Sequence, residues 1–377
     1  MPISISNPLL STQIFIAIFI IAILFSLRPK KTDGIFPLVL TQELKGLAIL
    51  AVLFSHVGYF LSTDQRFLFP LTIMAGVGVN LFLFLSGYGL TVSSIKTPLP
   101  VLAFYKKRLL RLLVPFWLVI SSFFALDFFL HHQFYGWSYM FKSMVGFFPR
   151  ADVYMDVNSP FWFFTPILFY YVLFPLIFRA KHSWVAPVIL YVSSYVLTKT
   201  SLPVTVDVMR LYQVHLLAFP LGMVFAIILP LLFRRWQIVK TWVIEVILQN
   251  KNINLIGSLG RIILMAGLLY LIGYTAYFSN VGGSVNLEQI TSLVTMGAIV
   301  WLFILKQFEI KVLYLFGIYA YEIYLLHWPV MSHFDFLFKY LPGWLAQIGY
   351  LVFFIGLAWC LNKLVQLIVV KLSRKKV

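Results

Sequence analysis

The residues best suited to chemistry in this sequence are one histidine and one lysine in a nearly apolar stretch. "ELKGLAILAVLFSHVGYF" begins at Glu43, with Lys45 near its start and His56 deep inside it. Successive helical residues are rotated by 100°, so Lys45 and His56 would share a helix face, about 16 Å apart along the axis. A neutral imidazole is a natural general base for activating a hydroxyl, because its pKa lies near the operating pH.

Each of these residues also has a structural interpretation. Lys45 could snorkel to lipid headgroups. With Thr41 as the N-cap, it would lie in the first helical turn, where the helix dipole disfavours a cation. His56 could be a neutral core histidine bonded to a neighbour. Ionisable groups at membrane depth are costly, however, which favours a functional role for His56.

A second histidine lies in "GIYAYEIYLLHWPV", which begins at Gly317. If a helix starts there, His327 lies about 15 Å into it and matches His56 in depth. Tyr324 would lie one turn before His327, on the same face.

Glu322, in the same segment, would need a partner if it is buried. Lys45 and Arg111 are the candidates, because both are expected near the same end of the helices. Glu322 could be catalytic or could belong to a structural ion pair.

A basic cluster in "FYKKRLLRLLVPFW" contains Lys107, Arg108 and Arg111. Arg108 and Arg111 are three residues apart and share a helix face. Paired guanidinium groups bind phosphates in a bidentate manner, and coenzyme A carries a diphosphate and a further phosphate. The structural alternative is contact with anionic lipid headgroups.

Four further residues are candidates for substrate contacts. Ser86 and Tyr88, in a glycine-rich stretch, could hydrogen-bond a substrate or only a helix backbone. Trp162 could stack on a sugar ring or pack in the core. His215 is expected a few turns into the membrane from outside, where an acceptor hydroxyl could arrive.

The composition places most of this chain in lipid. Of its 377 residues 61% are hydrophobic and only 11% are charged, too few to cover a soluble domain of this length. The formal net charge of +17 suits the positive-inside rule better than nucleic-acid binding. The single cysteine, Cys360, excludes an internal disulfide and a cysteine-based metal cluster, and no metal site is predicted.

The hydropathy pattern predicts an all-α membrane protein with about eleven transmembrane helices. Basic residues follow the first apolar run instead of preceding it, so we expect a retained span with the N-terminus outside and the C-terminus cytosolic. Most of the 29 lysines and arginines then fall on the cytosolic side. The predicted spans are 9–27, 42–62, 71–94, 109–131, 161–178, 184–199, 210–233, 262–279, 289–305, 316–333 and 345–369.

In their order, spacing and sidedness, these motifs resemble the acyltransferase 3 family of multi-pass membrane O-acyltransferases. The resemblance covers about 41–369 and implies an acyltransferase domain of ten helices at 41–377. Residues 1–40 would add a transmembrane helix and a basic cytosolic linker. The matching residues are Lys45 with His56, Arg108 with Arg111, the Ser-Gly-aromatic element at Ser86, Gly87 and Tyr88, and the late element at Tyr321, Tyr324, Leu325 and His327.

The resemblance implies transfer of an acyl group, usually acetyl from acetyl-CoA, to a hydroxyl of an extracytoplasmic glycan or glycolipid. His56 would be the catalytic histidine, acting as a base or carrying the acyl group, and Lys45 its basic companion. Glu322 and His327 are further catalytic candidates. The donor would be held by Arg108 and Arg111, with Lys107, Ser86 and Tyr88 as further candidates. The expected acceptor contacts are Trp162, His215 and Tyr324. The expected location is the plasma membrane of a bacterium, with the lipid bilayer as a partner, no nucleic acid, and a homo-oligomer left open.

The sequence departs from the family at one position and leaves rival functions open. Where many relatives carry a Glu-Glu pair, this chain has Pro166, Ile167 and Leu168, so no acidic base is expected there. The rivals are a glycan or lipid exporter and a proton-coupled transporter that would use His56, Glu322 and His327 as a relay. Paired broken helices would favour an exporter, and the sequence gives no sign of them.

Overall fold

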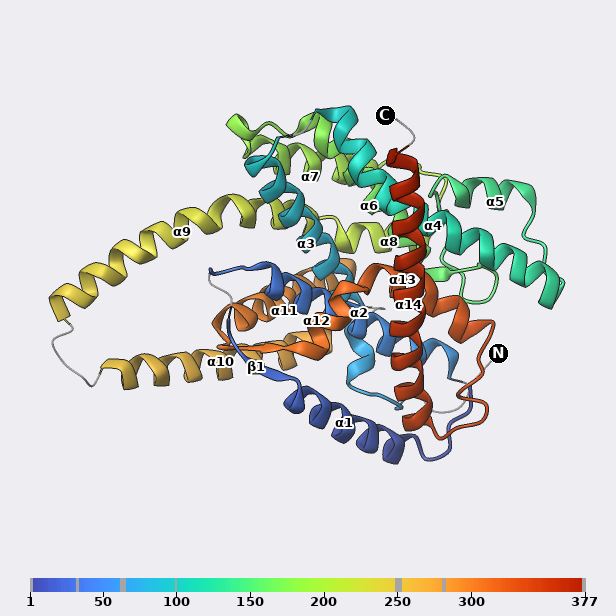
Figure 1. The fold of residues 1–377 in the computed structure, drawn as a ribbon, viewed down its shortest axis with the longest axis horizontal. Helices are drawn as coiled ribbons and strands as arrows, with labels where there is room; N and C mark the ends of the chain where they lie inside the picture. Colours follow the sequence, from blue (N-terminus) through green and yellow to red (C-terminus); the bar gives the residue numbers. More distant parts are fainter. Residues whose placement is uncertain are drawn as a thin grey trace.

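The computed structural model describes residues 3–31, 34–61, 66–98, 100–247, 253–279 and 283–374, with side chains except at 233–258 and 370–374. This part of the chain is nearly all helical, which confirms the predicted all-α membrane fold (Figure 1). One antiparallel pair, β1 (Leu27–Pro29) with β2 (Phe308–Ile310), is the only sheet in these ranges. The helices are α1 (Pro8–Phe25), α2 (Leu38–Phe60), α3 (Ala75–Lys96), α4 (Val101–His131), α5 (Trp137–Met144), α6 (Phe164–Ile177), α7 (Val185–Leu197), α8 (Val206–His215), α9 (Ala218–Ile247), α10 (Ile253–Phe278), α11 (Val285–Leu305), α12 (Lys311–Ile318), α13 (Ala320–Ser332) and α14 (Gly343–Arg374), with short 3₁₀ turns at Leu71–Ile73, Ser159–Phe163 and Ala180–His182.

Nine segments of the described chain are long and apolar enough to cross a membrane. Two of the eleven predicted spans are not among them. The span at 184–199 is α7, a helix of 13 residues, and the span at 316–333 is divided between α12 and α13. The count of eleven and the orientation of the chain therefore remain predictions.

Two helical segments are interrupted, although the sequence shows no sign of broken helices. Tyr319, between α12 and α13, has φ −104° and ψ 12° and leaves the helical conformation. No proline or glycine occupies this position, and the interruption therefore had no local signal in the sequence. A second interruption follows His215, where α8 ends before α9 begins at Ala218.

Close helix crossings hold the two interrupted segments against α2 and α3. At Gly46 on α2 and Gly317 on α12, an added Cβ would collide with the main chain of the opposite helix, at Leu313 and Gln42 respectively. Only glycine permits main chains to approach this closely. The crossing of α3 and α9 has the same reciprocal form, with Gly87 against Phe219 and Gly222 against Phe84.

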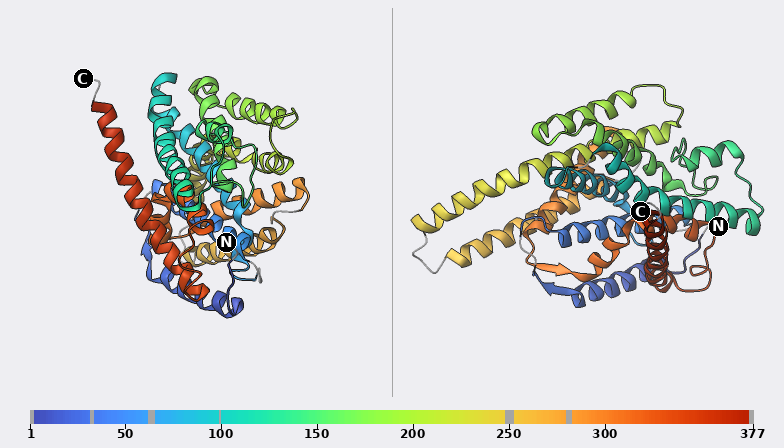
Figure 2. Two further views of the ribbon diagram at one scale, coloured as in Figure 1. Left: turned by 90° about the vertical axis from the view of Figure 1, so that its right-hand side faces the viewer. Right: turned by 45° about the horizontal axis from the view of Figure 1, so that its top comes forward.

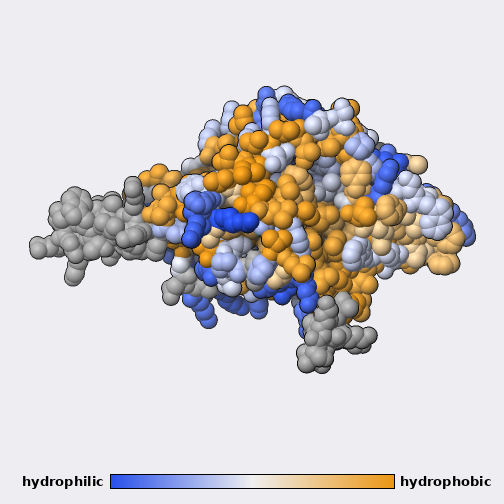
Figure 3. All heavy atoms as spheres, turned by 90° about the horizontal axis from the view of Figure 1, so that it is seen from above, coloured by the Kyte–Doolittle hydropathy of each residue, from blue (hydrophilic) through white to orange (hydrophobic). Residues whose placement is uncertain are grey.

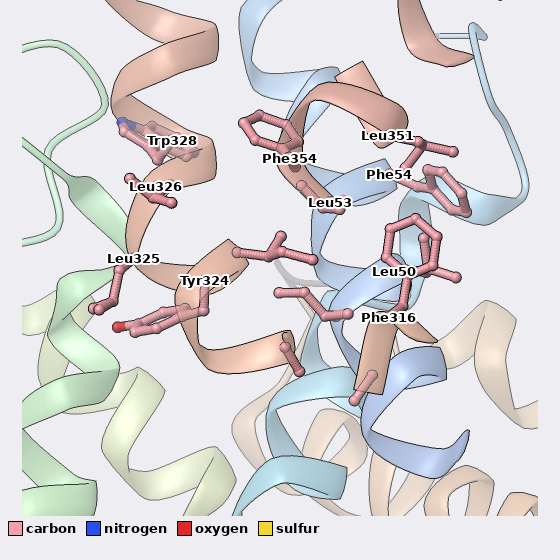
Figure 4. Packing of buried hydrophobic residues seen from close by; sticks show 14 of the residues in the cluster. Leu50, Leu53, Phe54, Phe316, Tyr324, Leu325, Leu326, Trp328, Leu351 and Phe354 are labelled. Carbon is pink, nitrogen blue, oxygen red and sulfur yellow. The ribbon is translucent and has the colours of Figure 1, made fainter. Parts of the chain in front are cut away.

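The buried core surrounds α2 and α13. Leu50, Leu53 and Phe54 of α2 belong to the same buried cluster as Leu325 of α13 and Phe354 of α14 (Figure 4). By contrast, α1, α10 and α14 bury little of their apolar surface within the protein. Figure 2 shows α14 along one side of the helical bundle. It also shows α9 and α10 projecting together from the bundle. Figure 3 shows that hydrophobic residues, in orange, make up much of the face seen from above, which is the kind of surface that lipid covers.

Helix α2 begins earlier than the sequence predicted. Its N-cap is Pro37, whereas Thr41 lies inside the first turns and donates its hydroxyl to the Leu38 carbonyl at 2.7 Å. Thr41 is therefore not the N-cap. Lys45 lies about two turns into the helix, beyond the region where the dipole acts on a charge.

A buried ion pair fixes this end of α2. Glu43 contacts Lys306 Nζ at 2.8 Å and accepts a hydrogen bond from the Ile310 main-chain N–H. Both side chains are nearly inaccessible, at 1% and 6% exposure. The pair links α2 to the end of α11 and to β2.

Glu43→Ala is expected to destabilise the protein by about 3–5 kcal/mol, because it leaves the Lys306 charge buried and unpaired. Thermal unfolding in detergent would measure the loss. The double variant Glu43→Ala/Lys306→Ala should be less destabilised than Glu43→Ala alone, since it removes both charges. Equal stability of the wild type and Glu43→Ala would show that the pair contributes nothing.

Candidate active site

Two histidines from helices far apart in the sequence meet at the centre of the bundle. His56 of α2 and His327 of α13 have Nδ1 and Nε2 2.7 Å apart, and their rings stack with centroids at 5.0 Å and an interplanar angle of 9°. His327 is fully buried. The direct contact agrees with the prediction that His56 and His327 lie at the same depth.

The hydrogen bonds around His327 decide which nitrogen atoms carry protons. His327 Nδ1 lies 2.9 Å from the carbonyl oxygen of Tyr324 and 3.2 Å from that of Ile323. Carbonyl oxygens only accept, so His327 Nδ1 is the donor and its Nε2, in the neutral ring, is an acceptor. His56 Nδ1 must then donate to His327. This assignment leaves the lone pair of His56 Nε2 available to take a proton.

His56 faces a cavity of about 300 Å³, which we call the histidine cavity. Its walls include His56, Trp162, Arg210, His215 and Trp328. The Trp328 ring stands edge-on to His56, with centroids 5.1 Å apart, and its indole nitrogen is buried without a hydrogen bond among the described residues. Figure 4 shows Trp328 and Tyr324 on α13, which they share with His327.

His215 lies on another wall of the histidine cavity. Its Nδ1 is 2.8 Å from Asn80 Oδ1, and the Asn80 amide donates to Ser292 Oγ at 2.9 Å. His215 Nδ1 therefore carries the proton, and its Nε2 is an acceptor. Trp162 stacks on the His215 ring at 5.6 Å and 19°, so one face of the indole is already occupied.

A second cavity, of about 270 Å³, contains the basic residues, and we call it the arginine cavity. Lys45, Arg108, Arg111 and Ser86 line it. Arg108 Nη2 donates to Ser93 Oγ at 2.9 Å.

Two polar atoms of the arginine cavity are unusual. Arg108 Nε and Gln42 Oε1 are buried and form no hydrogen bond in the part of the chain that the structure describes. Buried polar groups normally have partners. This arrangement suits a polar ligand that carries negative charge and hydrogen-bond donors.

Three aromatic residues line both cavities and form the partition between them: Phe82, Phe163 and Tyr324. The ring of Phe163 lies 6.4 Å from Phe82 and 5.7 Å from Tyr324. The Tyr324 hydroxyl donates to the Pro160 carbonyl at 2.9 Å. A molecule held at the arginines would therefore reach His56 past these three side chains.

Glu322 has a different partner from those predicted. Asn362 of α14 donates to Glu322 Oε1 at 2.6 Å, and no ion pair joins Glu322 to Lys45 or Arg111 among the described residues. The long final helix places a neutral amide beside the carboxyl group, which satisfies it without a cation. Glu322 lines neither cavity.

Two of the predicted donor-site residues lie elsewhere. Lys107 is exposed on α4 and does not line the arginine cavity. Tyr88 packs against Phe36 and Phe225, with ring centroids at 4.7 and 5.8 Å. Lys107 is next to Arg108 and Tyr88 is two residues after Ser86, and helical rotation turns both side chains away from the cavity that Arg108 and Ser86 line.

Sequence reasoning missed several residues that line the two cavities. Gln42 and Tyr171 belong to the arginine cavity, and Tyr59, Asp207 and Arg210 to the histidine cavity. Gln42 lies one helical turn before Gly46 and three residues before Lys45, so the helical period could have identified it. No local signal connects Asp207 and Arg210 with His56.

Comparison with known proteins identifies the family. A family model described as an acyltransferase domain, that of the acyltransferase 3 family, matches residues 44–363, most of the chain. No curated protein and no solved structure matches the chain. The match spans Lys45, His56, the two arginines and His327. The chain belongs to the acyltransferase 3 family of membrane proteins.

Proposed function

We propose that this protein transfers an acyl group from acyl-CoA to a hydroxyl of an extracytoplasmic glycan or glycolipid. The acyl group that we propose is acetyl. The observation that carries the proposal is the meeting of two cavities at one aromatic partition. One cavity offers cations, and the other offers a histidine nitrogen with a free lone pair. Under the orientation predicted from basic residues, the arginine cavity faces the cytosol, where acyl-CoA is made.

The arginine cavity fits the phosphates of coenzyme A. Lys45, Arg108 and Arg111 supply three cations within one cavity, and guanidinium groups bind phosphate in a planar, bidentate manner. The unpartnered atoms Arg108 Nε and Gln42 Oε1 could donate to a phosphate and accept from a polar group of the donor.

His56 is proposed as the general base. Its Nε2 removes the proton of the acceptor hydroxyl as that oxygen attacks the thioester carbonyl. The new C–O ester bond forms, the C–S bond breaks, and the thiolate of coenzyme A leaves and takes up the proton from His56. His56 lines the histidine cavity and not the arginine cavity. Its position on the acceptor side favours a base over a residue that carries the acyl group.

The histidine pair keeps His56 in the reactive tautomer. His327 Nε2 accepts a hydrogen bond from His56 Nδ1, and His327 Nδ1 donates to two carbonyl oxygens of α13. Both nitrogen atoms of His327 form hydrogen bonds within the protein, so neither is free to contact the substrate. We therefore assign His327 a positioning role, comparable to the residue that orients the base in other acyl-transfer sites.

Reconstitution into liposomes tests the function directly. Acetyl-CoA labelled in its acetyl group would be supplied on the side of the arginine cavity and a glycan acceptor on the other. We expect labelled ester on the glycan and one coenzyme A released for each ester formed. Mass spectrometry of envelope polysaccharide from a deletion strain would then identify the acyl mass and the acceptor.

Transport without chemistry is the second candidate, because α8–α9 and α12–α13 are interrupted helices of the kind that form transporter sites. The same liposomes distinguish the two functions. The transporter would be favoured if the liposomes moved a glycan, or protons together with a small molecule, without any acyl-CoA. In that case the protein would need no donor site.

The aromatic partition is expected to limit the length of the acyl group. Phe163→Ala should raise the preference for butyryl-CoA over acetyl-CoA about tenfold, because it widens the partition between the two cavities, and each methylene in such a site changes discrimination by 10- to 200-fold. The ratio of kcat/KM for the two donors measures this. Phe161→Ala, which removes a neighbouring ring that lines neither cavity, is the control. An unchanged ratio in Phe163→Ala would show that the acyl group takes another path.

A further inference from the structure

A third cavity lies between α6 and α7, beside the histidine cavity. It has a volume of about 190 Å³, and we call it the apolar cavity. Leu83, Phe169, Leu197 and Val204 are among its walls. Carbon atoms dominate this surface, so a hydrocarbon would bind there without losing hydrogen bonds to water.

The apolar cavity is connected with the acceptor side of the proposed reaction. It shares Trp162 and His215 with the histidine cavity and shares no residue with the arginine cavity. A molecule that fills it could extend past the stacked Trp162 and His215 rings towards His56. The donor, entering at the arginines, could not reach it without first passing the partition.

Most polar groups of the apolar cavity are already used within the protein. Ser194 and Thr198 donate their hydroxyl hydrogens to helix carbonyls, and Thr165 donates to the Gly146 carbonyl at 3.0 Å. Tyr212 Oη differs, because it is buried and forms no hydrogen bond in the described part of the chain. Tyr212 also lies 6.3 Å, ring to ring, from Trp162. The cavity thus offers a hydroxyl where it borders the histidine cavity and hydrocarbon elsewhere.

We infer that the apolar cavity binds the hydrocarbon chain of the acceptor, so that the acceptor is an amphipathic alcohol attached to a lipid. Its polar part, with the reacting hydroxyl, occupies the histidine cavity, and Tyr212 hydrogen-bonds the oxygen at the junction with the chain. This inference rests on the proposed acyl transfer, which requires the reacting hydroxyl to point towards His56. Binding of the hydrocarbon chain can nevertheless be measured without any reaction.

Alkyl glucosides of one sugar and different chain length are suitable probes. With acetyl-CoA as donor, kcat/KM should rise from methyl to octyl glucoside, by about fourfold for each methylene that becomes buried. Leu197→Trp fills the cavity and should abolish this rise, so that octyl glucoside reacts no better than methyl glucoside. Val196→Trp places the same ring on the neighbouring, 52% exposed position and should behave as the wild type. An undiminished rise in Leu197→Trp would overturn the inference.

Photolabelling provides a readout that needs no turnover. Octyl glucoside with a diazirine at the end of its chain, in phosphatidylcholine nanodiscs, should label the peptide around 194–204, and unlabelled octyl glucoside should suppress the label. Labelling restricted to other peptides, or suppression by added phosphatidylcholine alone, would overturn the inference by showing no site or only a bilayer lipid. Correct labelling without ester formation would instead count against the proposed acyl transfer.

Discussion

His56→Ala is expected to lower kcat for acyl transfer by about 10²- to 10⁴-fold, the usual contribution of a positioned general base. The variant loses the only nitrogen in the histidine pair whose lone pair the hydrogen-bond network leaves free. Initial rates of coenzyme A release from purified protein, with a saturating glycan acceptor, would measure the effect.

Two controls separate chemistry from folding in this experiment. Affinity for coenzyme A should be unchanged in His56→Ala, because His56 does not line the arginine cavity. His182→Ala, at an exposed histidine between α6 and α7, should retain full activity. Undiminished turnover in His56→Ala would exclude this histidine from the reaction and leave the histidine pair with a structural role.

Arg108→Ala should weaken the binding of coenzyme A by about 30-fold or more, since removing one partner of a partly buried charge pair usually costs 2 kcal/mol or more. Arg108 is better placed than Arg111 to bind the ligand. The Nε of Arg108 is buried without a hydrogen-bond partner among the described residues and its Nη2 donates to Ser93, whereas Arg111 is exposed. Calorimetric titration with coenzyme A would give the dissociation constants.

The matched control is Lys107→Ala, which removes a cation from the adjacent, exposed position. It should bind coenzyme A as the wild type does. Titration with dephospho-coenzyme A, which lacks the third phosphate, would show which phosphate Arg108 contacts. An equal loss of affinity for both ligands would place Arg108 at the diphosphate. A smaller loss of affinity for dephospho-coenzyme A would place Arg108 at the third phosphate. Unchanged affinity in Arg108→Ala would mean that this residue contacts lipid headgroups instead.

The local sequence determined the features that depend on a single helix. Low charge and long apolar runs required a membrane fold, and the helical period placed Lys45 and His56 on one face, where each now lines a cavity. The same period paired Arg108 with Arg111. These predictions require no knowledge of packing, because the geometry of one helix is fixed by its own hydrogen bonds, whatever surrounds it.

The local sequence did not decide where α2 begins or which residues of different helices meet. The capping prediction at Thr41 failed because Pro37 begins the helix earlier. The prediction of a cation beside Glu322 failed because α14 brings Asn362 there. Tyr88 and Lys107 belong to the right motifs, but their helices turn them away from the arginine cavity.

Only the tertiary structure assembled the candidate site. His56 and His327 are 271 positions apart, and their contact depends on how α2, α12 and α13 pack around the Gly46–Gly317 crossing. The aromatic partition likewise takes Phe82, Phe163 and Tyr324 from three separate segments. Residue type and spacing specify which face of each helix is reactive. Which faces meet is decided by close packing between helices, where one side chain too large would prevent the approach.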